Sequence, residues 1–225
     1  MNIEQTGLVR RARTHAALAD VTRLRIVDQL STSDASASEL SGALDIPSNL
    51  LAHHLSVLDA AELIDRRQSE GDRRRNYLSL RQRETWMDVE AVAGREPAPG
   101  RVIFVCTANT ARSHLAAAMW RQASPIRASS AGTHPGPAIN PDAMLAAQRH
   151  GLAMPEIAPV RLADAMQEDD FVVTVCDRAH EELAGRTHAH WSIPDPVPDG
   201  SSAAFDTAHA ELADRIHSLA PRWVG

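Results

Sequence analysis

The stretch VIFVCTANTARSHLAAAMW, residues 102–120, joins an apolar strand to a helix through a short polar loop. The strand ends at Cys106, and the helix begins near Arg112 with a run of leucine and alanine. A loop at such a junction aims several backbone N–H groups at one point, and the helix N-terminus adds partial positive charge. An oxyanion fits this cradle, and Arg112 is placed to bind it through two parallel N–H donors.

The same positive surroundings favour the thiolate form of Cys106, which is the nucleophilic form of a cysteine. Ser113 follows the arginine directly and can donate a further hydrogen bond to the sulfur. The alternative is that Cys106 is a plain core residue, since buried cysteines are common at strand ends. The strand before it, the helix after it and the serine beside Arg112 favour the anion-binding nucleophile.

Length, charge and cysteine content limit the class of protein. The chain has 225 residues, a net charge of −6 and two cysteines, and all of its 23 basic residues are arginine. This length accommodates two small domains, and the negative balance restricts any DNA contact to a local patch. Two cysteines do not make a disulfide scaffold, and neither a signal peptide nor a membrane-spanning run is present. We therefore expect a soluble cytoplasmic protein with no membrane partner.

Strands alternate with helices over residues 100–225, which predicts an α/β domain with a four-stranded parallel sheet and helices on both faces. If the first and third strands are neighbours, Cys106 and Cys176 meet at the carboxyl edge of this sheet. The expected strands are RVIFVC (101–106), IRASSAGT (126–133), DDFVVTVC (169–176) and THAHWSI (187–193).

Residues 1–81 have the order of an α+β winged helix-turn-helix, and residues 82–99 follow as a further helix and linker. Ser36 or Ser38 can cap the first helix of the helix-turn-helix pair and Ser48 the second. The hairpin that forms the wing turns at SEGD, between flanking arginines. The underlying segments are HAALADVTRLRIVDQLS (15–31), with an apolar face that includes Leu18, Val21, Leu24, Ile26, Val27 and Leu30, then SASELSGALDIPSNLLAHHLSVLDAAELI (36–64) and LIDRRQSEGDRRRNYLSL (63–80).

The second half resembles the low-molecular-weight protein tyrosine phosphatase family and, within it, the arsenate reductases built on the same fold. VCTANTARS, SSAGT, VVTVCDRAHEE and HWSIPDP are the segments that carry this resemblance. It implies that Cys106 is the nucleophile, Arg112 the oxyanion clamp and Asp195 the general acid. Ala117 replaces a glutamate that helps many of these reductases bind potassium, so we predict no metal site. The anion loop implied by the resemblance comprises Thr107, Ala108, Asn109, Thr110 and Ala111, with Asn109, Ser113 and Ser130 holding its shape.

The second cysteine separates two activities. In an arsenate reductase, Cys106 attacks arsenate, and Cys176 or a small thiol then attacks the adduct and releases arsenite. Relatives that use thioredoxin carry a third cysteine where this chain has Leu183. Recycling should therefore need an external thiol reductant, mycothiol with mycoredoxin, and thioredoxin is kept as the alternative. We predict no bound cofactor. In a phosphatase, Cys176 is an incidental buried residue and an aromatic side chain is expected after the DP pair, where Val197 stands.

The first half resembles the ArsR-type winged-helix repressors, through ALADVTRLRIVDQL, HHLSVLDAAELI and SEGDRRRNYLSL. The resemblance implies a homodimer that binds a double-stranded DNA operator with a recognition helix from about Ser48 to Ala61. Residues 1–100 contain no cysteine, which excludes the thiolate arsenite sensor usual in these repressors. The expected groove contacts are Ser48, Asn49, His53 and His54, and the expected phosphate contacts are Arg66, Arg67, Arg73, Arg74 and Arg75.

Three functions fit these observations. The preferred one is a fused transcriptional regulator and thiol-dependent arsenate reductase. The second is a low-molecular-weight phosphatase fused to the same DNA-binding domain. The third is a repressor that senses an oxyanion or redox state without turnover, which the complete set of nucleophile, arginine and acid disfavours.

Overall fold

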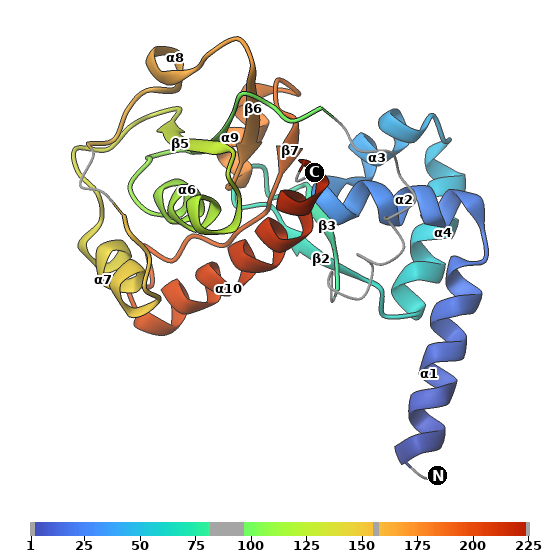
Figure 1. Cartoon of the computed structure of the whole chain (residues 1–225). Helices are drawn as coiled ribbons and strands as arrows, with labels where there is room; N and C mark the ends of the chain where they lie inside the picture. The colour runs from blue at the N-terminus through green and yellow to red at the C-terminus, as the bar shows by residue number, and fades with distance from the viewer. Residues whose placement is uncertain (1–2, 82–96, 155–157, 224–225) are drawn as a thin grey trace.

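The structure, a computed structural model, describes residues 3–81, 97–154 and 158–223 (Figure 1). It confirms the predicted fold classes: a helical region with a small antiparallel sheet is followed by an α/β region with a parallel sheet. The further helix expected within residues 82–99 falls mostly outside the described residues. In the part of the chain that the structure describes, no helix combines the length and apolar character needed to cross a membrane.

The first half has the order of helices and strands that the sequence predicts. Its sheet has the order β1-β3-β2, and the β2–β3 hairpin pairs Ile64 with Leu80 and Gln68 with Asn76, so the wing turns where predicted. The elements are α1 (Ile3–Leu18), α2 (Val21–Thr32), β1 (Ala35–Ser36), α3 (Ala37–Leu44), α4 (Ser48–Ala60), β2 (Ile64–Gln68) and β3 (Asn76–Leu80).

The helix starts differ in part from those expected. Ser36 caps α3, because its Oγ accepts from the N–H of Glu39 while the Glu39 carboxylate accepts from the N–H of Ser36. Ser48 does not cap α4: it is the first helical residue, and Pro47 holds the capping position without a side-chain bond.

The apolar face expected over residues 15–31 is interrupted. Helix α1 ends at Leu18, and Asp20 caps α2 by accepting from the N–H of Arg23 at 2.9 Å. The chain therefore changes direction between α1 and α2, and Val21 is 74% exposed and Leu24 36% exposed instead of packing in the core. Ile26, Val27 and Leu30 are buried, as predicted.

The second half contains the four predicted strands in the order β5-β4-β6-β7, all parallel, so the first and third strands of this half are neighbours. Helices α6 and α10 cover one face of the sheet, and α8 and α9 cover the other (Figure 1). The elements are β4 (Arg101–Cys106), α6 (Arg112–Ala123), β5 (Arg127–Gly132), α7 (Pro141–Arg149), α8 (Leu162–Ala165), β6 (Asp170–Thr174), α9 (Asp177–Leu183), β7 (Ala189–His190), α10 (Ser202–Leu219) and a final 3-10 turn (Ala220–Trp223).

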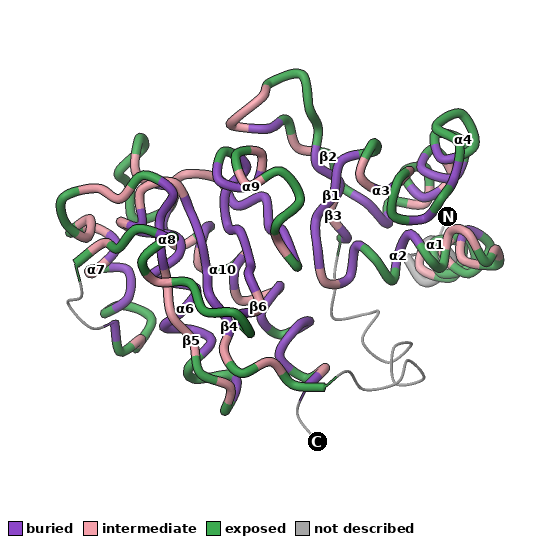
Figure 2. Tube along the Cα trace, turned by 90° about the horizontal axis from the view of Figure 1, so that it is seen from above, coloured by how far each residue is buried: buried purple, intermediate pink, exposed green. Residues whose placement is uncertain are grey.

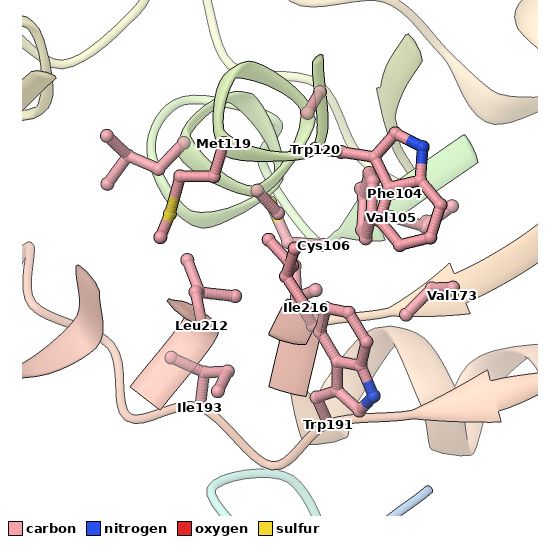
Figure 3. Close-up of a cluster of buried hydrophobic side chains, with 14 of the residues drawn as sticks. Phe104, Val105, Cys106, Met119, Trp120, Val173, Trp191, Ile193, Leu212 and Ile216 are labelled. Atoms are coloured by element: carbon pink, nitrogen blue, oxygen red, sulfur yellow. The ribbon is translucent and has the colours of Figure 1, made fainter. Parts of the chain in front are cut away.

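The core of the second half forms around β4, whose residues from Val102 to Cys106 are all buried. A near-continuous apolar run of this kind is typical of a central parallel strand covered on both faces. Figure 3 shows Phe104 between Trp120 of α6 and Trp191 beyond β7, with ring centroids 5.8 and 5.6 Å from that of Phe104. This rigid strand carries Cys106 at its end.

A buried polar contact joins the two halves. The carboxylate of Asp34, which precedes β1, accepts from Arg215 of α10 at 2.6 Å, and the two side chains are 0% and 6% exposed. The same carboxylate accepts from the N–H of Ser192, and the indole of Trp191 donates to the carbonyl of Thr32 at 2.8 Å. These bonds fix the winged half against the sheet half.

Candidate active site

The loop after β4 holds Cys106 as the sequence predicts. Cys106 is 3% exposed, and its Sγ accepts a hydrogen bond from the N–H of Asn109 at 3.2 Å. The Oγ of Ser113 lies 3.1 Å from the same sulfur. Because Arg112 and Ser113 open α6, the sulfur also lies near the N-terminus of a 12-residue helix. The sulfur therefore has hydrogen-bonding groups and a helix N-terminus on several sides.

The peptides of the loop are oriented by a neighbouring segment. The carbonyls of Cys106, Thr107, Ala108 and Thr110 accept from the backbone N–H groups of Thr133, His134, Gly136 and Asn140, at 2.8–3.2 Å. In a trans peptide the N–H points opposite to the carbonyl, so these peptides direct their N–H groups inward. This orientation produces the row of donors that an oxyanion requires.

Asn109 holds the loop in shape from its centre. Its φ of 51° is left-handed, a conformation that asparagine tolerates better than most residues. Its Oδ1 accepts from the N–H of Val160 at 2.9 Å and its Nδ2 donates to Ser113 at 2.8 Å. The neighbouring Ala108 has no positive φ, so its backbone does not require a glycine.

The second strand contributes a glycine to the support of the loop, beside the serine that was predicted to act there. A Cβ on Gly132 would lie 2.7 Å from the carbonyl oxygen of Thr107, so only glycine lets β5 approach the loop. Ser130 was expected to hold the loop, and its Oγ lies 3.3 Å from Nδ1 of His114, which is hydrogen-bonded to the backbone of Asn109 in the loop. The SSAGT segment thus supports the loop through its glycine, a role that sequence reasoning missed.

Arg112 gathers the acidic groups of the site. Its side chain is 8% exposed, and its Nη2 lies 3.0 Å from Oδ2 of Asp195. Its Nη1 lies 3.1 Å from Oε2 of Glu70 and donates to the carbonyl of Ile193 at 2.8 Å. Burial alone lowers the pKa of Arg112, but the surrounding acidic groups raise it overall, so the guanidinium stays charged.

The second cysteine shares the pocket. Cys176 immediately precedes α9, and its Sγ lies 3.4 Å from Oγ1 of Thr107. Both cysteines are free, and both line a cavity of about 530 Å3 together with Arg112 and Asp195. Burial raises the pKa of the Cys176 thiol, although the charge of Arg112 opposes this. The sheet therefore brings together the four predicted catalytic residues.

The recognition helix presents only part of its predicted DNA contacts. Ser48, Asn49 and His53 are exposed on α4. His54 is buried, with its Nδ1 3.6 Å from Oδ1 of Asp20, so its predicted place in the major groove is wrong.

The arginines of the wing also divide into two groups. Arg66, Arg73, Arg74 and Arg75 are exposed along the hairpin. Arg67 instead donates to both carboxylate oxygens of Glu211 on α10, at 2.8 and 2.7 Å. Its predicted phosphate contact is therefore corrected to a contact between the two halves.

The tip of the wing docks on α9, which the sequence did not predict. Ser69 donates to Glu181 at 2.6 Å, and the N–H of Glu70 donates to Asp177 at 2.8 Å. A Cβ on Gly71 would lie 2.2 Å from Oε2 of Glu181, so the glycine allows this close approach. Figure 2 shows the β2–β3 hairpin reaching toward α9. The SEGD turn gave no signal for this contact because its partners lie more than 100 residues away.

A layer of rings and carboxylates packs beneath the docked wing. His180 and His190 stack with centroids 4.0 Å apart, and the ring of Tyr77 lies 4.5 Å from that of His190. The Nε2 atoms of the two histidines lie 3.0 Å from Oε1 of Glu39 and 3.2 Å from Oδ1 of Asp177, respectively. Burial by itself raises the pKa of Glu39, but hydrogen bonds from His180 and Ser36 outweigh it and lower that pKa to about 2.

A cysteine and an arginine in one strand–helix loop, facing an aspartate, define a cysteine-nucleophile enzyme domain for oxyanions, here joined to a helix-turn-helix domain. Residues 101–223 match the family model of the low molecular weight phosphotyrosine protein phosphatases. Residues 20–66 match the model of the bacterial regulatory proteins of the arsR family. The chain thus belongs to the low-molecular-weight phosphatase family and carries an arsR-family DNA-binding domain in front of it.

Solved structures resemble the second half. The tyrosine phosphatase Wzb from Escherichia coli K30, in complex with sulphate, is 19% identical over 56% of this chain and 100% of its own, with a TM-score of 0.51. An arsenate reductase from Archaeoglobus fulgidus is 25% identical over 53% and 98%, and a YwlE mutant from Bacillus subtilis 24% over 54% and 96%, both with TM-scores of 0.48. In the comparison with curated proteins, none matched.

Proposed function

We propose that the chain is a thiol-dependent arsenate reductase fused to a transcriptional regulator. The observation that carries this proposal is that Cys176 lines the same cavity as Cys106, within contact of the anion loop through Thr107. A phosphatase needs one nucleophilic sulfur, whereas reduction of arsenate consumes two thiols. A phosphotyrosine-binding site favours an aromatic side chain at the position of Val197. The valine there favours arsenate, the smaller substrate.

The chemistry balances with the groups present. The Cys106 thiolate attacks arsenic(V), an S–As bond forms, and one arsenate oxygen leaves as water with a proton from Asp195. Cys176 then attacks the Cys106 sulfur, an S–S bond forms, and the electrons of the S–As bond reduce arsenic to arsenic(III), which leaves as arsenite. Arg112 and the inward N–H groups neutralise the charge of the bound oxyanion.

The buried second thiol sets the pH dependence of the reduction step. Because burial raises the pKa of Cys176, this thiol is protonated in the resting site and must lose its proton before it attacks. The rate of reduction therefore rises with pH through the neutral range. An external thiol, mycothiol with mycoredoxin or thioredoxin, then restores both cysteines.

The second candidate function is a phosphatase, and the position of the Asp195 carboxylate favours it. Its carboxylate lies at the clamp, 3.0 Å from Arg112, where a general acid for an alcohol leaving group is needed. In this case Cys176 has no part in turnover.

We also propose that the regulator half binds an operator as a homodimer. The exposed Ser48, Asn49 and His53 of α4 supply the base contacts, and the exposed wing arginines supply the phosphate contacts. Arsenate reduction and DNA binding would then reside in one chain.

A parallel assay of the full-length protein separates the two activities. Arsenite release is measured in a single turnover with arsenate and no added thiol, and phosphate release with a phosphotyrosine peptide, for the reduced wild type, Cys106→Ser and Cys176→Ser. We expect both variants to lose arsenite release by at least about 100-fold, because each removes one of two required thiols. Robust peptide turnover that survives Cys176→Ser, without arsenite release by the wild type, would establish the phosphatase instead.

A further inference from the structure

The anion clamp already holds a carboxylate from the DNA-binding domain. Oε2 of Glu70, at the tip of the wing, lies 3.1 Å from Nη1 of Arg112, and Oε1 accepts from the N–H of Asp195 at 2.9 Å. Glu70 also lines the cavity that contains Cys106. A carboxylate with one oxygen on the guanidinium and the other on a backbone N–H binds as a small oxyanion does.

The main chain of the wing presents this carboxylate to the site. The N–H of Glu70 donates to Asp177 at 2.8 Å, and its carbonyl accepts from Nε of Arg178 at 3.2 Å. On either side, Ser69 and Asp72 donate to the two carboxylate oxygens of Glu181, at 2.6 and 2.7 Å. A ligand tethered in this way acts at a high effective concentration, so Glu70 competes with dissolved anions.

An incoming oxyanion and Glu70 require the same donors. The guanidinium of Arg112 contacts Glu70, Asp195 and the carbonyl of Ile193, so a bidentate bond to arsenate or phosphate requires at least one carboxylate to leave. Charge repulsion acts in the same direction, since an oxyanion close to the carboxylates of Glu70 and Asp195 is disfavoured. Asp195 is needed for catalysis in the proposed function, whereas Glu70 is not.

We propose that Glu70 is a built-in competing ligand of the oxyanion site, which inorganic oxyanions displace, and that its displacement loosens the wing tip from α9. The proposal rests on the proposed function only in taking the loop around Cys106 as an oxyanion site. The competition by Glu70 thereby sets the concentration of dissolved anion at which the oxyanion site becomes occupied. Because coupling is reciprocal, whatever draws the wing tip away from α9, including bound DNA, raises the affinity of the site for the anion.

Calorimetric titration with inorganic phosphate tests the competition on the full chain. We compare the wild type, Glu70→Gln, which keeps the shape but removes the charge, and the control Glu168→Gln, an exposed carboxylate at the opposite edge of the sheet. We expect Glu70→Gln to bind phosphate at least about tenfold more tightly, a difference of about 1.4 kcal/mol, and the control to bind as the wild type does.

The two other outcomes have different meanings. Equal affinity for the wild type and Glu70→Gln would overturn the competing role of Glu70 but leave the oxyanion site intact. No binding by either protein would overturn both the site and the competition.

Hydrogen exchange tests the effect on the wing. Saturating phosphate should accelerate exchange of the Glu70 and Asp72 amides in the wild type and in Glu168→Gln, because their acceptors on α9 are released. In Glu70→Gln the same amides should exchange faster before phosphate is added. Unchanged exchange in the phosphate-saturated wild type would overturn the loosening of the wing.

Discussion

Replacing Asp34 with asparagine should loosen the contact between the two halves. The asparagine amide would keep an acceptor for the N–H of Ser192 but would leave the buried guanidinium of Arg215 without its nearest counter-charge, now 2.6 Å away. Removing one partner of a buried pair costs about 3–5 kcal/mol. Glu211 lies 3.7 Å from Arg215 and compensates in part, so we expect a loss of about 3 kcal/mol.

The assay is urea unfolding, followed by tryptophan fluorescence, with a thermal scan beside it. For a chain of this size, a loss of about 3 kcal/mol lowers Tm by roughly 6–12 °C. Trp191, one of four tryptophans, donates across the same contact, so its contribution to the fluorescence should change when the halves separate. The wild type should unfold in one transition, whereas Asp34→Asn should approach two.

Asp65→Asn is the matched control. Asp65 and Arg81 are 2.7 Å apart, close to the 2.6 Å of the buried pair, but their side chains are 52% and 46% exposed. An exposed pair contributes at most about 1 kcal/mol, so this variant should unfold almost as the wild type does. An equal loss of unfolding free energy in Asp34→Asn and Asp65→Asn would refute the reasoning. The two pairs have similar distances, and the expected difference rests on burial alone.

Three further variants probe the wing, the interface and the loop. Arg74→Ala should weaken operator binding in a fluorescence anisotropy titration. The slope of log K against log salt concentration should fall by about 1, as the loss of one phosphate contact requires. An unchanged slope would show that Arg74 does not contact a phosphate. Because the pKa of Glu39 is lowered to about 2, its stabilising effect is complete above its ordinary value of 4.5 and is lost as pH falls towards 2. Glu39→Gln should therefore destabilise the protein at pH 7 and flatten the acid limb of a stability–pH curve, and an unaltered limb would contradict this. Gly132→Ala should abolish turnover while the chain stays folded by circular dichroism, since its Cβ would meet the Thr107 carbonyl at 2.7 Å; full activity would show that the loop tolerates the shift.

Local spacing was enough to predict the loop, because Cys106, Asn109, Arg112 and Ser113 lie within eight residues of one strand–helix junction. The alternation of strands and helices was enough to place Cys176 beside them. Parallel strands end at one edge of the sheet, so that prediction needed no knowledge of side-chain contacts.

The predictions failed where a shift of one residue along a helix, or a partner far away in the sequence, determines what a side chain contacts. The helical spacing of Leu51, His54, Leu55 and Leu58 places them on one buried face, and attention to that spacing would have separated His54 from His53.

Arg67 and Glu70 could not be predicted by any pattern. Arg67 pairs with Glu211 and Glu70 with Arg112, so each contact depends on how the two halves pack against each other. Neither partner lies near in sequence, and each residue alone resembles an ordinary charged side chain of a hairpin.

Peptide-mapping mass spectrometry after arsenate treatment tests the central claim most directly. The fully reduced wild-type protein is mixed with arsenate without added thiol, quenched by alkylation and digested, and released arsenite is measured in the same sample. A disulfide between Cys106 and Cys176, with one arsenite released per chain, is the predicted result. Recovery of both cysteines alkylated, with no arsenite formed, would contradict the account.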